Sequence, residues 1–283
     1  MRIKKVLKLC DLPFGLYEKS ICSNLSWEDK FTLIKDAGYD YFEISIDGTP
    51  EKLNRLEDRN EQLHIRRASE SLDTPLYTFA LTANRFYPLG SEDESIRREG
   101  VRLLKRALDF AAFVGAKTMN IASYDEYQKP GNKNTAGFFV DSLKECVDHA
   151  SIRGVIISLE TMDTPFIDCT RKALQFVRAF DSAFLQIGVD PGNISAMGHN
   201  PITDIPAGGG HIVEVEFKDT RPGVVRDVFF GEGTLDFDAC FRMLHEIQYQ
   251  GFLAAEMWCH DDPTFHPKIY QAAKFLKNKM ADY

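Results

Sequence analysis

VIISLE at residues 155–160, LQIGVD at 185–190, HIVEVEF at 211–217 and FLAAEMW at 252–258 are short apolar runs with the length and composition of β-strands. Four more runs of this kind precede them: FGLYE (14–18), DYFEIS (40–45), LYTFALT (76–82) and KTMNIAS (117–123). Longer amphipathic stretches between these runs predict helices. Those stretches are 26–37, 51–70, 91–115, 134–153, 170–180, a short one near 203–208, 235–249 and 263–281.

Eight strand–helix units in 283 residues predict an α/β fold, a (β/α)8 TIM barrel that forms one domain over 1–283. No linker rich in Ser, Pro or Gly divides the chain. A doubly wound open sheet is the alternative fold. Neither G-x-G-x-x-G nor G-x-x-x-x-G-K-[ST] follows any of the runs, so the usual nucleotide-phosphate fingerprints of such sheets are missing.

The composition excludes several classes of protein. With 44% hydrophobic and 27% charged residues, the chain is a folded globular protein rather than a disordered one. Its 34 Lys and Arg against 42 Asp and Glu give a net charge of −8, which argues against nucleic acid as the main partner. Six scattered cysteines without a C-x-x-C motif fit a reducing compartment. The sequence has no run of 18 apolar residues, so it predicts no membrane span. We therefore expect a cytoplasmic protein.

Carboxylates stand at or near the ends of the last four predicted strands. They are Glu160, Asp190, Glu216 and Glu256. In a barrel these strand ends surround the active site, so the four acids would form a half ring of like charges. Such crowding is unfavourable without a cation, which predicts a divalent metal. Oxygen ligands favour Mg²⁺ or Mn²⁺, although Zn²⁺ and Co²⁺ also accept carboxylates.

The seventh predicted strand carries more charge than the others. Glu214, Glu216 and Lys218 share one parity along it and would point the same way. Lys218 could then neutralise part of the carboxylate charge. The alternative is a β-bulge that shifts the register and turns Glu214 towards a helix or solvent.

Further polar residues follow other strands and are candidates for binding a substrate. Glu18 follows the first strand, and Asn84 and Arg85 follow the third. Arg85, Lys218 and Arg221, with the loop at 231–233, could hold an anion through fixed cations and backbone N–H groups. The alternative for each of these residues is an ordinary place on the solvated surface.

The segments around these residues carry a resemblance to a known family. They are FGLYEKS (14–20), DAGYDYFEISID (36–47), RFYPLGSEDES (85–95), ASYDEYQ (122–128), LETMD (159–163), DPGNISA (190–196), GHIVEVEFKDTRPG (210–223), FGEGTLDF (230–237) and AAEMW (254–258). In order and spacing the chain resembles the L-ribulose-5-phosphate 3-epimerase family, also labelled L-xylulose-5-phosphate 3-epimerase or hexulose-6-phosphate isomerase. The resemblance covers nearly the whole chain.

The resemblance implies a xylose-isomerase-like TIM barrel with a divalent metal held by Glu, Asp, His and Glu. Glu160, Asp190 and Glu256 match three of these ligands. Where the family has His in H-x-K-D-T, this chain has Glu216 in E-F-K-D-T. Asn84 likewise stands where relatives often carry a histidine. The metal, Mn²⁺, Zn²⁺, Mg²⁺ or Co²⁺, is therefore expected to have four carboxylate ligands.

The activity implied is the 3-epimerisation of a ketopentose phosphate, L-ribulose 5-phosphate or L-xylulose 5-phosphate. Glu160 and Glu256 would remove and return the C3 proton through an enediolate. We expect the protein to bind a small sugar phosphate. We also expect it to form a homodimer. Because Glu216 replaces the family histidine, a drifted sugar isomerase and a non-catalytic sugar-phosphate-binding paralogue remain alternatives. Phosphodiester hydrolysis on the same barrel is disfavoured, because it needs a histidine-rich metal cluster and the predicted strand ends lack one.

Overall fold

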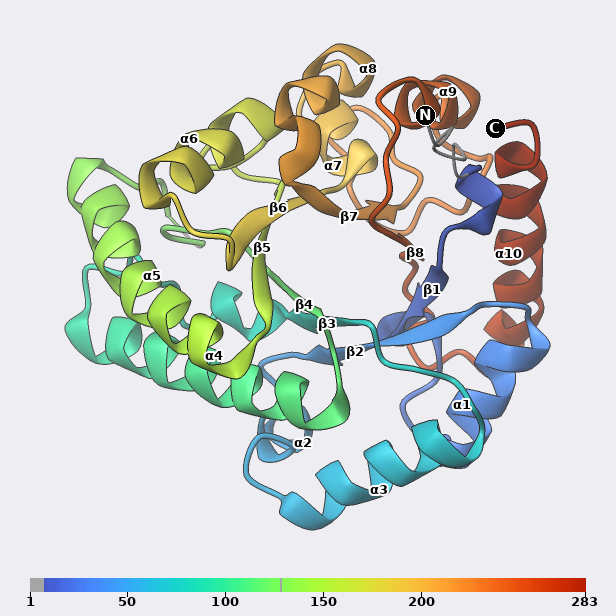
Figure 1. The fold of residues 1–283 in the computed structure, drawn as a ribbon, viewed down its shortest axis with the longest axis horizontal. Coiled ribbons are helices and arrows are strands. Elements are labelled where there is room, and N and C mark those ends of the chain that lie inside the picture. The colour runs from blue at the N-terminus through green and yellow to red at the C-terminus, as the bar shows by residue number, and fades with distance from the viewer. Residues whose placement is uncertain (1–7, 128) are drawn as a thin grey trace, which may run out of the picture.

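The computed structural model describes residues 8–127 and 129–283, in which eight parallel strands close into a single barrel (Figure 1). Each strand pairs with the next along the chain, and β8 pairs with β1 to close the ring. The strands are β1 Phe14–Tyr17, β2 Tyr41–Ile46, β3 Thr78–Leu81, β4 Thr118–Ile121, β5 Ile156–Glu160, β6 Leu185–Val189, β7 Ile212–Phe217 and β8 Phe252–Ala255. The predicted barrel and the predicted strands are confirmed.

Helices surround the barrel on its outside (Figure 1). The α-helices are α1 Trp27–Asp36, α2 Pro50–Asn54, α3 Arg59–Ser71, α4 Glu94–Val114, α5 Lys133–Arg153, α6 Thr170–Phe180, α7 Pro191–Ala196, α8 Pro201–Asp204, α9 Phe237–Glu246 and α10 His266–Met280. Short 3-10 helices are η1 Leu9–Asp11, η2 Glu18–Ser20, η3 Thr82–Arg85, η4 Ile205–His211 and η5 Pro263–Phe265. Among the described residues, no helix is both long enough and apolar enough to cross a membrane.

Two helix predictions need correction. The stretch 51–70 is two helices, because the side chain of Asp58 accepts hydrogen bonds from Asn60 N and Glu61 N and so begins a second helix, α3. The short helix near 203–208 is the junction of α8 and η4. Sequence analysis also missed α7, which Asp190 caps at its N-terminus and Pro191 begins.

The two faces of the barrel strands differ in character. In β2, Phe42, Ile44 and Ile46 belong to the apolar core that packs against the helices. The alternating residues Tyr41 and Glu43 point into the barrel, where both side chains have no exposed surface. Tyr41 needs glycine as its neighbour, because a Cβ on Gly15 would lie only 2.3 Å from the Tyr41 ring. At β2 the barrel interior therefore holds an aromatic and an acidic side chain, while the apolar side chains of the strand pack against the helices.

A bulge does occur beside β7, where the pairing with β6 shifts between Ile187 and Gly188. It does not turn Glu214 outward. Glu214 has no exposed surface, and its Oε2 accepts a hydrogen bond of 3.4 Å from Thr118 Oγ1 on β4, across the barrel. The alternative orientation of Glu214 towards a helix or solvent is therefore wrong, and Glu216 points inward with the same parity.

Candidate active site

A small cavity opens at the carboxyl ends of the strands. It is lined by Tyr17, Lys19, Ala80, Thr82, Arg85, Glu160, Met162, Asp163, Asn193, Glu216, Lys218, Arg226, Glu256 and Trp258. This is the end of a TIM barrel at which active sites are built. The structure thus brings the predicted residues Glu160, Glu216, Lys218, Glu256 and Arg85 to one cavity.

Three carboxylates converge beside this cavity. Glu160, Asp190 and Glu256 each place one oxygen so that all three atoms lie within 4.8 Å of one another. Glu160 is the last residue of β5, and Asp190 directly follows β6. Asp190 is held in place because its Oδ1 accepts a hydrogen bond of 3.0 Å from Asn193 N, at the start of α7.

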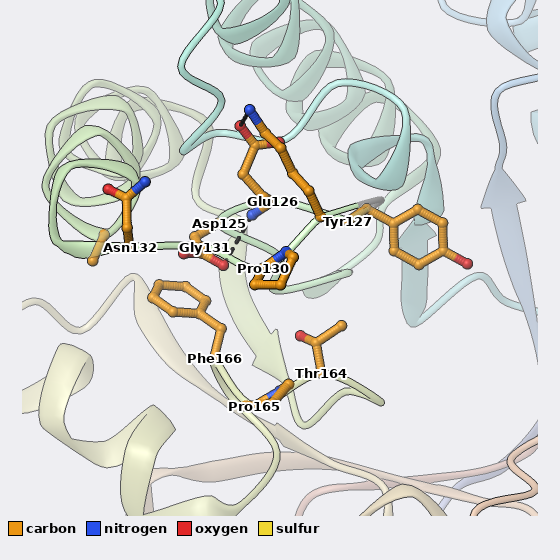
Figure 2. A pocket seen from close by; sticks show the side chains of 11 residues that line it. Asp125, Glu126, Tyr127, Pro130, Gly131, Asn132, Thr164, Pro165 and Phe166 are labelled. Carbon is orange, nitrogen blue, oxygen red and sulfur yellow. Dashed lines mark hydrogen bonds and ion pairs between the residues drawn. The ribbon is translucent and has the colours of Figure 1, made fainter.

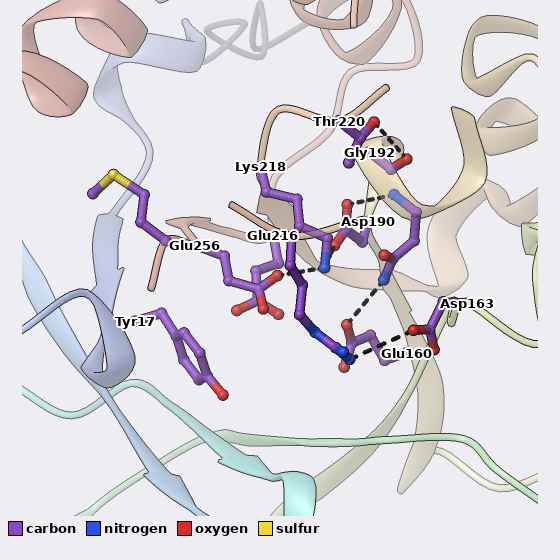
Figure 3. A network of polar contacts seen from close by, with 12 residues as sticks. Tyr17, Glu160, Asp163, Asp190, Gly192, Glu216, Lys218, Thr220 and Glu256 are labelled. Carbon is purple, nitrogen blue, oxygen red and sulfur yellow. Dashed lines mark hydrogen bonds and ion pairs between the residues drawn. The ribbon is translucent and has the colours of Figure 1, made fainter. Parts of the chain in front are cut away.

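The Lys218 ammonium group lies between two of these carboxylates (Figure 3). Its Nζ is 2.7 Å from Asp190 Oδ2 and donates a hydrogen bond of 2.8 Å to Glu256 Oε2. The same nitrogen lies 5.2 Å from the ring centroid of Trp258. Although burial favours the neutral amine, Asp190, Glu256 and Glu160 raise the pKa of Lys218 well above its ordinary value. Lys218 is therefore a fixed positive charge.

Glu216 also points into the barrel, with 3% of its surface exposed. Its Oε2 accepts a hydrogen bond of 3.2 Å from Asn120 Nδ2. Its Oε1 is buried and has no hydrogen-bond partner among residues 8–127 and 129–283. Burial, and next the charge of Glu256, raise the pKa of Glu216 well above its ordinary value. We refer to Glu160, Asp190, Glu216 and Glu256 together as the acidic group.

Among the described residues, the acidic group has more carboxyls than neighbouring cations to balance them. Burial, and next the charge of Glu256, raise the pKa of Glu160 well above its ordinary value. Burial raises the pKa of Asp190 to about 7, even though Lys218 opposes the shift. Perturbed carboxyls of this kind, gathered in a cavity, are typical of a catalytic or metal-binding site.

The donors of the acidic group fit a divalent metal. Three carboxylate oxygens converge, and the free Oε1 of Glu216 offers a further hard donor nearby. The ammonium of Lys218 beside two of these donors shows that this position attracts positive charge. A bound ion would compete with that ammonium for Asp190 and Glu256.

The remaining predicted residues lie in different surroundings. Glu18 is 2% exposed, and both its oxygens accept hydrogen bonds from Arg55 Nη1. Asn84 is buried, and its Oδ1 has no partner within the described part of the chain. Arg221 is exposed and donates through Nε and Nη2 to the carbonyl oxygen of Glu232. Binding roles for these three residues stay predictions.

Sequence analysis missed several residues that line the cavity, among them Asn193, Arg226 and Trp258. Asn193 donates from Nδ2 to Thr161 O at 2.9 Å and reaches Glu160 Oε1 at 3.5 Å. Its position could have been found, because Asp190 followed by proline is a helix-start signal that places Asn193 in the first turn. Arg226 and Trp258 belong to loops after β7 and β8, and no local pattern distinguishes them.

A second hollow lies between the loops that follow β4 and β5, next to the start of α5 (Figure 2). Its one buried aspartate, Asp125, has structural partners: Oδ2 accepts from Thr135 Oγ1 at 2.7 Å and Oδ1 from Glu126 N at 2.9 Å. Gly131 passes so close that a Cβ there would lie 1.8 Å from Asp125 Oδ2. Asp125 is therefore locked into this loop, and the acidic group remains the better candidate for chemistry.

Comparison with known families and relatives agrees with this geometry. The family model for the xylose isomerase-like TIM barrel matches residues 31–279. The chain is 36% identical over 271 residues to L-ribulose-5-phosphate 3-epimerase UlaE of Salmonella heidelberg (strain SL476), covering 95% of each chain. It is also 36% identical over 273 residues to UlaE of Escherichia coli O1:K1 / APEC, with 95% of each chain covered.

Solved structures similar to the chain share its fold. D-allulose 3-epimerase from Methylomonas sp. has a TM-score of 0.80 at 18% identity, covering 95% of this chain and 98% of the other. An L-ribulose 3-epimerase has a TM-score of 0.77 at 17% identity, covering 95% and 93%. The IOLI protein with a binding zinc atom has a TM-score of 0.75 at 22% identity, covering 96% and 97%.

Proposed function

The chain belongs to the xylose isomerase-like TIM barrel family and, within it, to the L-ribulose-5-phosphate 3-epimerases, and from this premise we propose its reaction and substrate. It is an isomerase of the epimerase type. Its proposed reaction inverts C3 of a ketopentose phosphate and interconverts L-ribulose 5-phosphate and L-xylulose 5-phosphate. The proposed oligomeric state is a homodimer, and light scattering on the purified protein would test it.

The observation that carries this proposal is the pair of carboxyls at one cavity, Glu160 from β5 and Glu256 from the end of β8. Inversion at C3 removes a proton next to the C2 carbonyl and returns one to the opposite face. Two proton-transferring groups are needed for this, one on each side of the substrate. The two glutamates come from strands that are not neighbours, so they can face a substrate from different directions.

In the proposed mechanism one of the two glutamates accepts the C3 proton and the other donates a proton to the opposite face. The Lys218 ammonium beside Glu256 stabilises negative charge as it develops on the substrate oxygens. Asn193 helps to orient Glu160 through its Nδ2. Burial of these groups excludes bulk water, which strengthens each of these electrostatic interactions.

Glu160, Asp190 and Glu256 are the proposed ligands of a divalent metal, with Glu216 as a fourth. When bound, such an ion supplies Lewis acidity that makes the C3 proton easier to remove. Carboxylates accept Mn²⁺, Mg²⁺, Co²⁺ and Zn²⁺, so the donor set does not single out one of them.

A non-catalytic sugar-phosphate-binding protein is the second candidate. The observation that favours it is the site itself, where Glu216 replaces the histidine of the family and Lys218 already pairs with two proposed ligands. A protein of this kind would bind the ketose phosphate but would not exchange its C3 proton with solvent.

Proton exchange in D₂O decides between the two candidates. Purified protein is incubated with L-ribulose 5-phosphate and excess Mn²⁺, Mg²⁺, Co²⁺ or Zn²⁺, or with a chelator, and the C3 proton is followed by NMR. The epimerase is expected to replace this proton with deuterium and to produce L-xylulose 5-phosphate. If the protein binds the substrate but no C3 proton exchange occurs with any of the four metals, the epimerase proposal is overturned.

A further inference from the structure

Two cysteines that lie far apart in the sequence meet beside the barrel. Cys22 follows η2 in the loop after β1, and Cys259 lies in the loop after β8, close to Glu256. Both cysteine side chains are buried, and the Sγ atoms of Cys22 and Cys259 are 4.0 Å apart. The two residues are 237 positions apart in the chain, so no spacing motif could have indicated this pair.

A carboxylate completes the cluster. Asp261 offers an oxygen that forms, with the sulfur atoms of Cys22 and Cys259, a group whose members all lie within 4.8 Å of one another. Its Oδ1 accepts a hydrogen bond of 2.6 Å from Ser23 N, and this bond lowers the pKa of Asp261, which is therefore charged at neutral pH. The backbone is left-handed at Asp261, with a φ of 57°, a conformation that a non-glycine residue keeps only where its surroundings impose it. We refer to Cys22, Cys259 and Asp261 as the thiol cluster.

Contacts of the two loops hold the sulfur atoms in place without a bond between them. Cys259 N donates a hydrogen bond of 2.9 Å to Lys19 O, in the loop after β1. The Cys22 thiol donates to Asp262 O at 3.5 Å, in the loop after β8. The donors of the thiol cluster are therefore already gathered, as a binding site requires.

The spacing of the two sulfur atoms fits a shared metal ion better than a disulfide. Two thiolates at a Zn–S distance of about 2.3 Å and a tetrahedral angle lie roughly 3.8 Å apart, close to the 4.0 Å between Cys22 and Cys259. A disulfide would require the sulfurs to approach to about 2.0 Å. Burial raises the pKa of the Cys259 thiol to about 12, which disfavours its reaction with an oxidant because the thiolate is the nucleophile. A bound cation instead displaces the thiol proton.

The thiol cluster can be reached from outside. A hollow of about 640 Å³ is lined by both Cys259 and Asp261, and Asp261 is exposed. The same hollow is lined by Trp258, which also lines the cavity of the acidic group. Two soft sulfur donors and one carboxylate favour Zn²⁺ over Mg²⁺ and Mn²⁺, and water from the hollow can supply a fourth ligand.

We propose that Cys22, Cys259 and Asp261 bind a thiophilic divalent cation, Zn²⁺ in preference to Mg²⁺ or Mn²⁺, that ties the loop after β1 to the loop after β8. This site is separate from the acidic group and does not depend on the proposed reaction. Because Cys259 directly follows Trp258, a bound ion also fixes one wall of the cavity at the strand ends.

Titration of the reduced, metal-free protein with Co²⁺ tests the proposal, because thiolate ligands give a sulfur-to-cobalt charge-transfer band that carboxylates alone do not give. The parent is expected to develop this band, and Zn²⁺ but not Mg²⁺ is expected to remove it by competition. Cys22→Ser and Cys259→Ser should each weaken this binding by more than the roughly 10- to 100-fold lost with an outer partner of a metal site, and Asp261→Ala by about tenfold. Cys146→Ser, at a buried cysteine on α5, is the matched control and should leave the band unchanged.

Three results would overturn the site. One is a parent protein without the band. Another is a band that survives in Cys22→Ser and Cys259→Ser, or that is lost instead in Cys169→Ser, whose thiol belongs to a different group of potential ligands. The third is a Cys22–Cys259 disulfide, found by peptide mapping after treatment with oxidised glutathione, in a protein that shows no band when reduced.

Two features keep the test decisive. Asp261 is exposed, so Asp261→Ala still tests the site if a cysteine variant does not fold. The charge-transfer band is measured without a sugar substrate. Failure of C3 proton exchange with the band intact would therefore count against the epimerase alone, and loss of the band with exchange intact against the thiol cluster alone.

Discussion

Two groups of buried carboxylates in this barrel have opposite charge balance. Glu18, after β1, is 2% exposed and is surrounded by three cations. Arg55 Nη1 lies 2.8 Å from its Oε2, Lys52 Nζ 3.4 Å from the same oxygen, and Lys30 Nζ 3.7 Å from Oε1. Although burial acts to raise it, these cations hold the pKa of Glu18 well below its ordinary value.

The acidic group, at the carboxyl ends of β5 to β8, has the opposite charge balance. Within the part of the chain that the structure describes, only two of its four carboxylates, Asp190 and Glu256, contact an ammonium, that of Lys218. Burial raises the pKa of Glu160, Asp190 and Glu216. Glu43 and Glu214 add two more carboxyls inside the barrel, and burial raises the pKa of both. The comparison teaches that burial alone does not identify a reactive site. A carboxylate with its full set of cations stabilises the fold, whereas a group short of cations is ready for a proton, a metal or a substrate.

The largest expected effect is on catalysis by the acidic group. Glu160→Gln and Glu256→Gln should each lower the rate of C3 proton exchange by about 10²–10⁴-fold, because the nearly isosteric amide cannot accept the proton. Thermal unfolding should stay cooperative in both variants. A variant that keeps more than about a tenth of the parent rate would remove its glutamate from the proposed mechanism.

The next largest effect is on stability and comes from removing one of the three cations around Glu18. Arg55→Met should lower the free energy of unfolding by about 3 kcal/mol, because it leaves Glu18 buried with weaker compensation. Urea denaturation at neutral pH measures this. Adding Glu18→Gln to Arg55→Met should recover part of the loss. If the double variant is no more stable than the single one, the cost comes from lost packing against Trp27, whose ring lies 4.7 Å from the Arg55 guanidinium carbon.

The sequence predicted the barrel well because each strand is a compact apolar run, and because helix ends carry local signals such as the left-handed Gly115 and Gly154 after α4 and α5. It also placed carboxylates at strand ends, since strand direction in a barrel fixes where those ends meet. Pairing of charges across the barrel is not local. The three cations around Glu18 come from residues up to 37 positions away, so no local pattern could assign them. Strand parity did indicate that Lys218 would neutralise carboxylate charge, but it did not indicate that Asp190 and Glu256 are its partners.

The third prediction removes the ammonium that competes for two proposed metal ligands. Lys218→Met should tighten Mn²⁺ binding by at least about tenfold, or ~1.4 kcal/mol, because Asp190 and Glu256 lose their internal cation. Calorimetry with the apo-protein measures this independently of activity. Binding that weakens or stays the same would mean that Lys218 does not compete with the ion.

The fourth prediction concerns the departure from the family pattern. Glu216→His should shift metal preference towards Zn²⁺ by roughly severalfold, because a neutral imidazole replaces a carboxylate at the edge of the site. The ratio of Zn²⁺ to Mn²⁺ affinity is the measurement. Glu216 Oε2 accepts a hydrogen bond from Asn120. Asn120→Ala is therefore a useful companion variant, because it removes this hydrogen bond and leaves residue 216 unchanged. An unchanged ratio in Glu216→His would place residue 216 outside the metal's ligands.

The last prediction is a pH dependence of stability in which Glu18 and Glu214, a further buried carboxyl inside the barrel, have opposite signs. Cations depress the pKa of Glu18, so its contribution to stability is present above the unfolded value of about 4.3 and is lost as pH falls below it. Burial raises the pKa of Glu214 to about 7, so the folded state holds more protons than the unfolded state between about pH 4.3 and 7. Over that interval Glu214 makes stability fall as pH rises, by at most about 1.4 kcal/mol per pH unit. Glu214→Gln should therefore flatten the decline measured by urea denaturation of the apo-protein at pH 5, 6 and 7, while Glu246→Gln, an exposed control on α9, should leave it unchanged. An identical slope in Glu214→Gln and the parent would show that Glu214 does not take up a proton on folding.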